Sequence, residues 1–162
     1  MKQWRALRKP VPHLAPIEWF NWLNDRGSLT QRLVNLSGGQ FQVEVVSNAF
    51  SYPRPDEYRT LNIGARRLCL IREVNLKGKG KTWVTARTII PTSSLCGPQR
   101  SLKSLGNRSL GSHLFRAASM RRGAIEIAHT DSNQWARRSV FWLSGRPLLV
   151  QETFLPALLK AH

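Results

Sequence analysis

An arginine and a glutamate each interrupt the apolar face of a predicted β-strand. In residues 68–76 every second side chain shares a face, and Arg72 stands there among three leucines and a valine. In residues 148–154 the same alternation places Glu152 between Val150 and Phe154. An unpaired buried charge costs several kcal/mol, so a protein keeps one only with a partner. We therefore expect Arg72 and Glu152 to face one polar cavity inside an apolar interior.

These two residue types suit the recognition of a small anion. An arginine makes bidentate contacts to carboxylate and phosphate groups. Strong burial would also perturb the protonation equilibria of both side chains, as is common at functional sites. Two other interpretations remain open at this point: a buried structural salt bridge, and a strand face that is exposed to solvent.

Two predicted helices begin with a serine cap. Ser28 precedes Leu29, and Ser109 precedes Leu110 and Gly111. The first turn of a helix has backbone N–H groups without intrahelical partners, and these groups bind carboxylates well. Gly111 would also permit a ligand to approach the backbone closely. Most capped helix starts bind only water, so each of these signals is weak when taken alone.

Other charged side chains carry weaker signals. Arg87 is a weaker third candidate for the cavity because it lies in a predicted strand among Trp83, Thr85 and Ile89. Arg137 and Arg138 are adjacent, so at most one of them points inward from its strand. The four histidines are isolated from one another, which favours structural or solvated roles over catalysis.

Several common enzyme motifs are missing from the sequence. The run Gly80-Lys81-Thr82 resembles the end of a phosphate-binding loop, but Asn75 stands where the first glycine belongs, and the context is a hairpin. The patterns Gly-x-Ser-x-Gly, His-Glu-x-x-His and Gly-x-Gly-x-x-Gly do not occur. Cys69 and Cys96 cannot form a disulfide framework, and no Cys/His cluster has zinc-ligand spacing. We therefore expect no metal site.

The elements that must position these residues alternate between short helices and hairpins. Periodicity and capping predict helices over residues 16–23, from Ser28 onwards and from Ser109 through Phe115. Strands are predicted at 40–46, 68–76, 82–90, 124–129, 138–143 and 148–155. Residues 51–60 are predicted as a loop, and residues 91–106 as a loop with one or two helical turns. Consecutive hairpins indicate an antiparallel sheet with helices packed against it, an α+β fold.

Length, composition and net charge indicate the size of the fold, its location and its partners. The chain has 162 residues with 41% hydrophobic residues, enough for one domain spanning 1–162 with a real core. No apolar run approaches the ~20 residues needed to cross a bilayer, and the N-terminus has no signal-peptide core, so a cytoplasmic location is expected. The net charge is +16, which favours nucleic acid, an acidic membrane surface or a small polyanionic substrate as partner. The basic residues are scattered and no nucleic-acid-binding motif is present, so we expect no nucleic-acid partner.

The sequence resembles the chorismate pyruvate-lyase family over about residues 22–156. The order and spacing of several blocks carry the resemblance, whereas any one block alone would be unremarkable. These blocks are Ser28-Leu29-Thr30, Ile71-Arg72-Glu73, Ala86-Arg87-Thr88-Ile89-Ile90-Pro91, Leu105-Gly106 with Leu110-Gly111 and Leu114-Phe115, Trp135-Ala136-Arg137-Arg138-Ser139, and Pro147 through Pro156.

The resemblance implies a fold, an activity and a set of ligand contacts. The family fold is a six-stranded antiparallel sheet with helical flaps over a buried ligand, and the family converts chorismate to 4-hydroxybenzoate and pyruvate for ubiquinone biosynthesis, without a cofactor. The family's ligand contacts correspond to Leu29, Arg72, Leu110 and Glu152 in this chain, with Arg72 and Glu152 as the catalytic pair. The family often has methionine in place of Leu29, and residues 50–67 match the family poorly.

Two other functions remain as alternatives. A non-catalytic sensor of aromatic acids could use the same fold, as some effector domains of bacterial transcription regulators do. Against it, the chain keeps both Arg72 and Glu152, and we expect no attached helix-turn-helix domain. A basic nucleic-acid-binding protein is the third possibility. We expect a monomer, with at most transient association with membranes or pathway enzymes.

Overall fold

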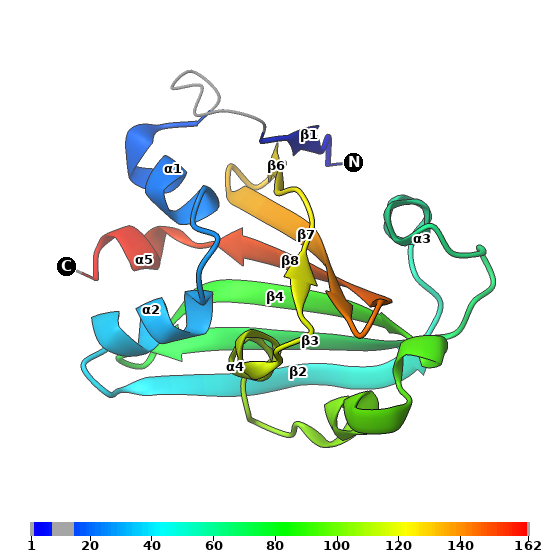
Figure 1. The fold of residues 1–162 in the computed structure, drawn as a ribbon. Helices are drawn as coiled ribbons and strands as arrows, with labels where there is room; N and C mark the ends of the chain where they lie inside the picture. Colours follow the sequence, from blue (N-terminus) through cyan, green and yellow to red (C-terminus); the bar gives the residue numbers. More distant parts are fainter. Residues whose placement is uncertain (1, 8–14, 162) are drawn as a thin grey trace.

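The computed structural model describes residues 2–7 and 15–161, which form an antiparallel sheet with helices packed against it (Figure 1). The helices are α1 (Ile17–Leu23), α2 (Leu29–Leu36), α3 (Pro55–Leu61), α4 (Leu110–Arg116) and α5 (Pro156–Leu159), with the 3₁₀ helices η1 (Thr92–Ser94) and η2 (Gly97–Ser104). The strands are β1 (Arg5–Ala6), β2 (Phe41–Ser51), β3 (Cys69–Gly78), β4 (Lys81–Pro91), β5 (Arg121–Arg122), β6 (Glu126–His129), β7 (Trp135–Leu143) and β8 (Arg146–Phe154). The α+β class is therefore confirmed.

The sheet of the described residues has eight strands, so the expectation of six is wrong. Their order is β1-β6-β7-β8-β4-β3-β2, and β5 pairs with β7. The six predicted strands are all present. The two additional strands, β1 and β5, have two residues each. Such short segments show no alternation in the sequence, and they become strands only through their pairing with β6 and β7.

The hairpin between β3 and β4 fixes the register that matters for the site. Its turn contains Lys79 and Gly80, with φ values of 52° and 78°, as in the tight turns that suit hairpin twist. Gly78 lies against the ring of Trp83, where an added Cβ would be 2.0 Å from a ring carbon. With the turn fixed in this way, Arg72 on β3 lies opposite Thr88 on β4.

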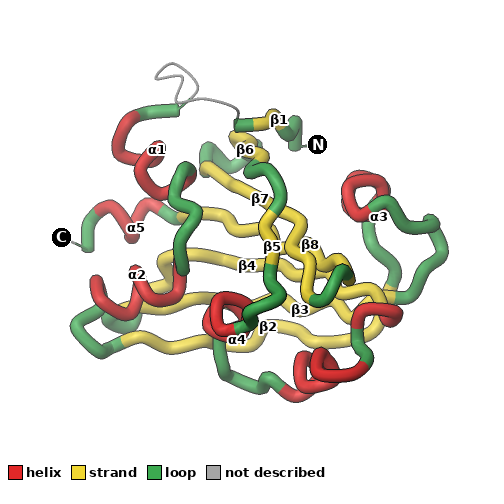
Figure 2. The backbone as a smooth tube through the Cα atoms, in the orientation of Figure 1, coloured by secondary structure: helices red, strands yellow, loops and turns green. Residues whose placement is uncertain are grey.

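The face of the sheet that carries Arg72 and Glu152 is covered by most of the helices (Figure 2). One apolar cluster joins Val74 and Phe154 of the sheet to Trp22 of α1, Leu33 of α2 and Leu158 near the C-terminus. A second cluster joins the sheet to the buried residues Leu102, Leu110 and Leu114 of η2 and α4. These helices therefore form the roof over the part of the sheet where the two charged side chains lie.

The opposite face is covered by α3, in a segment that the sequence predicts as a loop. Pro55 and Asp56 suggest a loop, but proline is tolerated in the first turn of a helix, and the structure has Pro55 there. The Glu57 side chain accepts a hydrogen bond from the Arg54 backbone N–H and so stabilises the start of the helix. Leu61 then packs on the sheet with Ile71 and neighbouring apolar residues. The loop prediction for residues 51–60 is wrong for this reason.

Strand β2 is longer than predicted, because the backbone pairing with β3 continues to Ser51. The register shifts between Val45 and Ser47, which breaks the alternation by which the strand is recognised. Among the helices of the described chain, none combines the length and the apolar character required to cross a lipid bilayer.

Candidate active site

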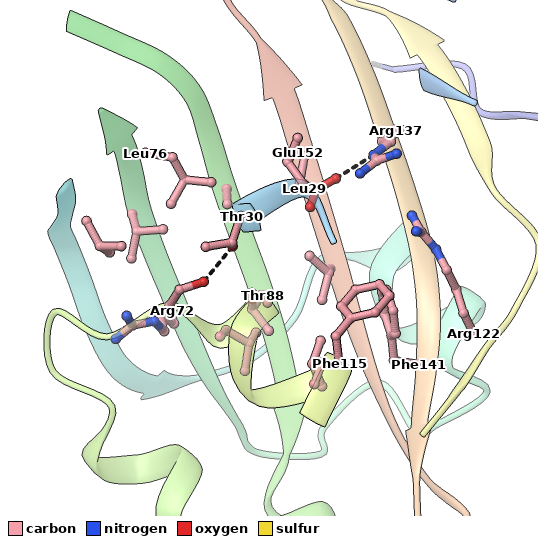
Figure 3. Close-up of a pocket in the computed structure, with 18 of the residues that line it drawn as sticks. Leu29, Thr30, Arg72, Leu76, Thr88, Phe115, Arg122, Arg137, Phe141 and Glu152 are labelled. Atoms are coloured by element: carbon pink, nitrogen blue, oxygen red, sulfur yellow. Dashed lines mark hydrogen bonds and ion pairs between the residues drawn. The ribbon is translucent and has the colours of Figure 1, made fainter. Parts of the chain in front are cut away.

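A cavity lies between the covered face of the sheet and the first turns of α2 and α4 (Figure 3). All four residues predicted as ligand contacts line it: Leu29, Arg72, Leu110 and Glu152. The walls between the polar groups are apolar side chains from both layers, including Val74, Leu76, Ala86, Leu114, Phe141 and Val150. The structure therefore brings the predicted residues together in one place, from two strands and two helices.

Arg72 is a buried arginine without an acidic partner among the described residues. Its relative exposure is 2%. Its Nη2 donates to the backbone carbonyl of Arg108 at 2.9 Å, whereas Nη1 is buried and has no hydrogen-bond partner in the described structure. Burial lowers the pKa of the guanidinium, although an arginine remains charged at neutral pH. An unsatisfied buried donor of this kind costs free energy and marks a place where an anion would be stabilised.

Glu152 forms an ion pair with Arg137 that the sequence analysis did not identify. The two residues are direct cross-strand partners on β8 and β7, and Arg137 Nε donates to Glu152 Oε2 at 2.6 Å. Arg137 Nη1 donates further to the carbonyls of Trp22 and Asp25. The pair is buried, with side-chain exposures of 1% for Arg137 and 14% for Glu152. The open alternative of a buried salt bridge is therefore correct for Glu152, which still faces the cavity.

The two predicted catalytic side chains belong to the same wall but do not pair with each other. Thr88 lies opposite Arg72, and Ala86, two residues away on β4, lies opposite Glu152. Strand β4 therefore lies between Arg72 and Glu152, and the two residues are offset by two positions along it. A ligand held between them would contact both.

Arg122 is a fourth charged residue of the cavity wall, and the sequence did not reveal it. It lies on β5 opposite Phe141, and its guanidinium carbon is 5.0 Å from the centre of the Phe141 ring. Nε donates to Ser139 Oγ at 3.2 Å and Nη1 to the Asp25 carbonyl at 3.4 Å. Burial, assisted by the nearby Arg137 charge, lowers its pKa to about 10. Arg122 is therefore cationic at neutral pH.

The predicted capped helix starts are confirmed, and they contact each other. Ser28 Oγ accepts from the Gln31 N–H, and Ser109 Oγ accepts from the Ser112 N–H. Each cap engages the third residue of its helix rather than Leu29 or Leu110. The hydroxyls of Thr30 and Ser109 are 2.6 Å apart and link α2 to α4.

Arg87 does not belong to the cavity, so its place as a third candidate is a wrong prediction. Strand alternation puts it on the opposite face, where Nε and Nη2 donate to the buried Glu57 of α3 and Nη1 donates to Glu73. These contacts raise the pKa of Arg87. Its charge serves to hold α3 on the sheet.

The charges of the cavity do not cancel. Of the three arginines that line it, one is paired with the single glutamate, which leaves a net positive interior. Apolar walls with a few placed polar groups are typical of small-molecule sites. In the described part of the chain, no cluster of three or more His, Cys, Asp or Glu side chains could hold a metal ion. The arrangement suits an anionic ring compound held by arginines and backbone N–H groups.

Solved structures with similar folds place the chain in a class. The effector domain of PhnF from Mycobacterium smegmatis has a TM-score of 0.58 and 13% identity, covering 81% of this chain and 90% of that one. A GntR-family transcriptional regulator from Bacillus cereus has a TM-score of 0.53 and 12% identity, covering 73% of this chain and 93% of that one. At these identities the similarity concerns the fold alone. The chain thus has this α+β fold, with a cavity under its helices.

Sequence comparison then narrows the class to one family. The sequence matches the family described as chorismate lyase over residues 7–161. A probable chorismate pyruvate-lyase from Methylococcus capsulatus is 39% identical over 86% of this chain and 96% of that protein. The chorismate pyruvate-lyase of Salmonella schwarzengrund is 37% identical over 97% of this chain and 94% of that protein. The chain belongs to the chorismate lyase family, and the resemblance stated from the sequence is confirmed.

Proposed function

We propose that this protein is a chorismate pyruvate-lyase that converts chorismate to 4-hydroxybenzoate and pyruvate, the step that supplies the ubiquinone ring precursor. One observation carries the proposal beyond family membership. Arg72 is buried in the cavity wall without an acidic partner, and one of its donors is unsatisfied. An anionic ligand would satisfy that donor and offset the cost of its burial.

The reaction needs little covalent help from the protein. The ether C–O bond to the ring breaks, the hydrogen on the hydroxyl-bearing ring carbon is lost, and the released enolpyruvate takes up a proton to become pyruvate. The ring becomes aromatic, which supplies much of the driving force. The enzyme must hold one reactive conformer and stabilise the negative charge that develops on the departing oxygen. No metal or organic cofactor is required.

Each of the four predicted residues has a role in this scheme. The backbone N–H groups of Leu29 and Leu110 hold the ring carboxylate. Arg72 binds an oxygen of the ether or of the side-chain carboxylate and stabilises it as it departs. Glu152 accepts a hydrogen bond from the ring hydroxyl or acts as a general acid or base. Its Oε2 is bonded to Arg137, so Oε1 is the oxygen that would face the ligand.

The proposal also covers the ligands, the location and the oligomeric state of the enzyme. Chorismate and 4-hydroxybenzoate are the expected small-molecule partners, and the enzyme would act in the cytoplasm as a monomer, with transient association with membranes or pathway enzymes. A cavity closed by two helices also predicts that product release is slow.

A turnover assay with purified protein tests the proposal. Incubation with chorismate should yield 4-hydroxybenzoate and pyruvate in equal amounts by chromatography. Arg72→Ala should abolish turnover, whereas Arg100→Ala on the exposed surface of η2 should not. Binding of chorismate without product would favour the sensor alternative. Salt-sensitive retention of RNA or DNA, with no binding of chorismate, would favour the nucleic-acid alternative.

A further inference from the structure

In the described part of the chain, two guanidinium groups of the cavity form no ion pair with a carboxylate. Arg137 is paired with Glu152 at 2.6 Å, and its Nη1 is bonded to two backbone carbonyls. Among the described residues, the Arg72 side chain has one hydrogen-bond partner, the Arg108 carbonyl. The two side-chain hydrogen bonds of Arg122 are to neutral oxygens, at 3.2 and 3.4 Å. Among the described residues, Arg72 and Arg122 are therefore the two cations of this cavity that remain to be balanced.

These two arginines lie on opposite sides of the cavity. Arg72 projects from β3, whereas Arg122 projects from β5, which pairs with β7 on the far side of β4 and β8. Figure 3 places them on opposite sides, with Glu152 and Leu29 between them. Apolar side chains of β3, β4 and β8 form the floor. A ring resting on this floor would have one guanidinium near each end.

The surroundings of Arg122 favour a ligand role over a purely structural one. Its hydrogen bond to the Asp25 carbonyl, at 3.4 Å, is longer than is usual for such a bond. Arg122 also lies beside the loop that leads into α2. Arg26 of that loop donates a hydrogen bond to the Arg122 backbone carbonyl at 3.1 Å. Burial and the repulsion from Arg137 disfavour its charge. A bound carboxylate would remove this penalty.

We propose that Arg122 is a second carboxylate-binding residue of the cavity, so that Arg72 and Arg122 each bind one carboxylate of a dianionic substrate. This inference rests on the proposed function, because chorismate carries one carboxylate on its ring and one on its enolpyruvyl side chain. With Arg72 on the side-chain end, Arg122 binds the ring carboxylate beside the start of α2. The reaction removes one of the two carboxylates with pyruvate, so the product keeps only one of these two contacts.

Three unreactive aromatic acids distinguish the binding role of Arg72 from that of Arg122. 3-(Carboxymethoxy)benzoate carries both carboxylates, 3-methoxybenzoate only the one on the ring, and phenoxyacetate only the one on the side chain. Their dissociation constants are measured by calorimetry for the wild type, R122Q and R72Q. R121Q is the matched control, because Arg121 is the exposed neighbour on the same two-residue strand.

We expect each variant to lose affinity for a different monocarboxylate. R122Q weakens the dicarboxylate and 3-methoxybenzoate by about tenfold to a hundredfold and spares phenoxyacetate, whereas R72Q weakens the dicarboxylate and phenoxyacetate and spares 3-methoxybenzoate. A mirrored pattern would still support one arginine per carboxylate, with the ligand reversed. R121Q should match the wild type. If R122Q leaves all three affinities unchanged, or weakens both monocarboxylates equally, the proposal is overturned.

Two further measurements keep the outcome interpretable. If R122Q does not fold, R122K retains the charge without the planar fork and should weaken one monocarboxylate by at least about threefold while sparing the other. Equal affinities for R122K and the wild type would overturn the proposal. Wild-type turnover of chorismate is assayed in parallel: if no 4-hydroxybenzoate forms, the proposed function fails, whereas the binding pattern still decides the role of Arg122.

Discussion

The hydroxyl groups of Thr30 and Ser109 form a hydrogen bond of 2.6 Å that joins the first turn of α2 to the cap of α4. Both residues line the inner cavity, and both also line a more open depression of about 440 Å³ that α2 and α4 form with the edge strand β2. The bond therefore lies between the site and the outside. Its rupture would allow the two helices to separate and a ligand to pass.

Thr30→Val should accelerate product release. The substitution keeps the shape of the side chain and removes the hydroxyl, at a cost to the closed state of about 1 kcal/mol, or roughly fivefold in rate. Stopped-flow displacement of 4-hydroxybenzoate measures this rate. Thr82→Val on β4, at a residue that does not line the cavity, is the matched control. Equal release rates for wild type and Thr30→Val would show that this bond does not limit opening.

Gly111→Ala should disturb the same contact from the other side. An added Cβ would lie 2.7 Å from Thr30 Oγ1, so either the Thr30 side chain must rotate and lose its bond to Ser109 or one of the two helices must shift. We expect the melting temperature to fall, although alanine is the better helix former. In Gly64→Ala, by contrast, the new Cβ would have its nearest neighbour at 3.6 Å, which is ordinary contact.

A double variant isolates the cause of that loss. Thr30→Ala removes the atom that the new Cβ would meet, so Thr30→Ala with Gly111→Ala should recover stability, with a coupling of about 1 kcal/mol or more in a double-mutant cycle. Additive effects of the two substitutions would mean that the clash is absorbed elsewhere.

Two arginines on opposite faces of the sheet, the buried Arg72 and the half-buried Arg87, should respond in opposite ways to the same substitution. Arg72→Gln removes a buried cation without an ion-pair partner, so kcat/KM should collapse while the free energy of unfolding changes little. Arg87→Gln leaves the fully buried Glu57 without its partner and should cost about 3–5 kcal/mol of stability. Urea unfolding and steady-state kinetics on both variants check this. Equal loss of stability in both variants would contradict it.

Much of the site could be predicted from the sequence, because strand alternation reveals a charged residue on an otherwise apolar face. Arg72 and Glu152 stand on faces that are otherwise apolar, and both indeed face the cavity. The role of Arg137 could be predicted only in part. Strand alternation predicts that Arg137 and Arg138 point to opposite faces of the sheet, but it does not predict which of them faces the cavity. The capped starts of α2 and α4 were accessible because a serine cap depends on local sequence.

The remainder depends on contacts between distant segments. Arg122 reaches the cavity only because a two-residue strand pairs with Phe141, and two residues show no periodicity. Arg87 and Arg72 look alike as single charges in neighbouring strands. The register of the β3–β4 hairpin and the position of α3 assign them to different faces. Such assignments arise from the assembled sheet rather than from any local pattern.

The contact between α3 and the sheet should make the fold sensitive to acid through Glu57. Burial alone would raise the pKa of this carboxyl, but hydrogen bonds from Arg87, the Arg54 N–H and Gln151, with the Arg87 charge, outweigh it and hold the pKa below its ordinary value of 4.5. A carboxyl with a depressed folded-state pKa contributes stability that is present above its unfolded pKa and is lost as pH falls. The free energy of unfolding should therefore decline as the pH falls below about 4.5.

Arg87→Gln should change the sign of this dependence. Without the guanidinium, burial dominates and raises the pKa of Glu57, so protonation then relieves a cost instead of removing a benefit. The stability deficit of Arg87→Gln relative to wild type should be largest at neutral pH and should shrink towards pH 4. Urea unfolding across this pH range measures it, with Arg100→Gln on the exposed surface of η2 as control. A deficit that stays constant across this range would assign the acid sensitivity to other carboxyls.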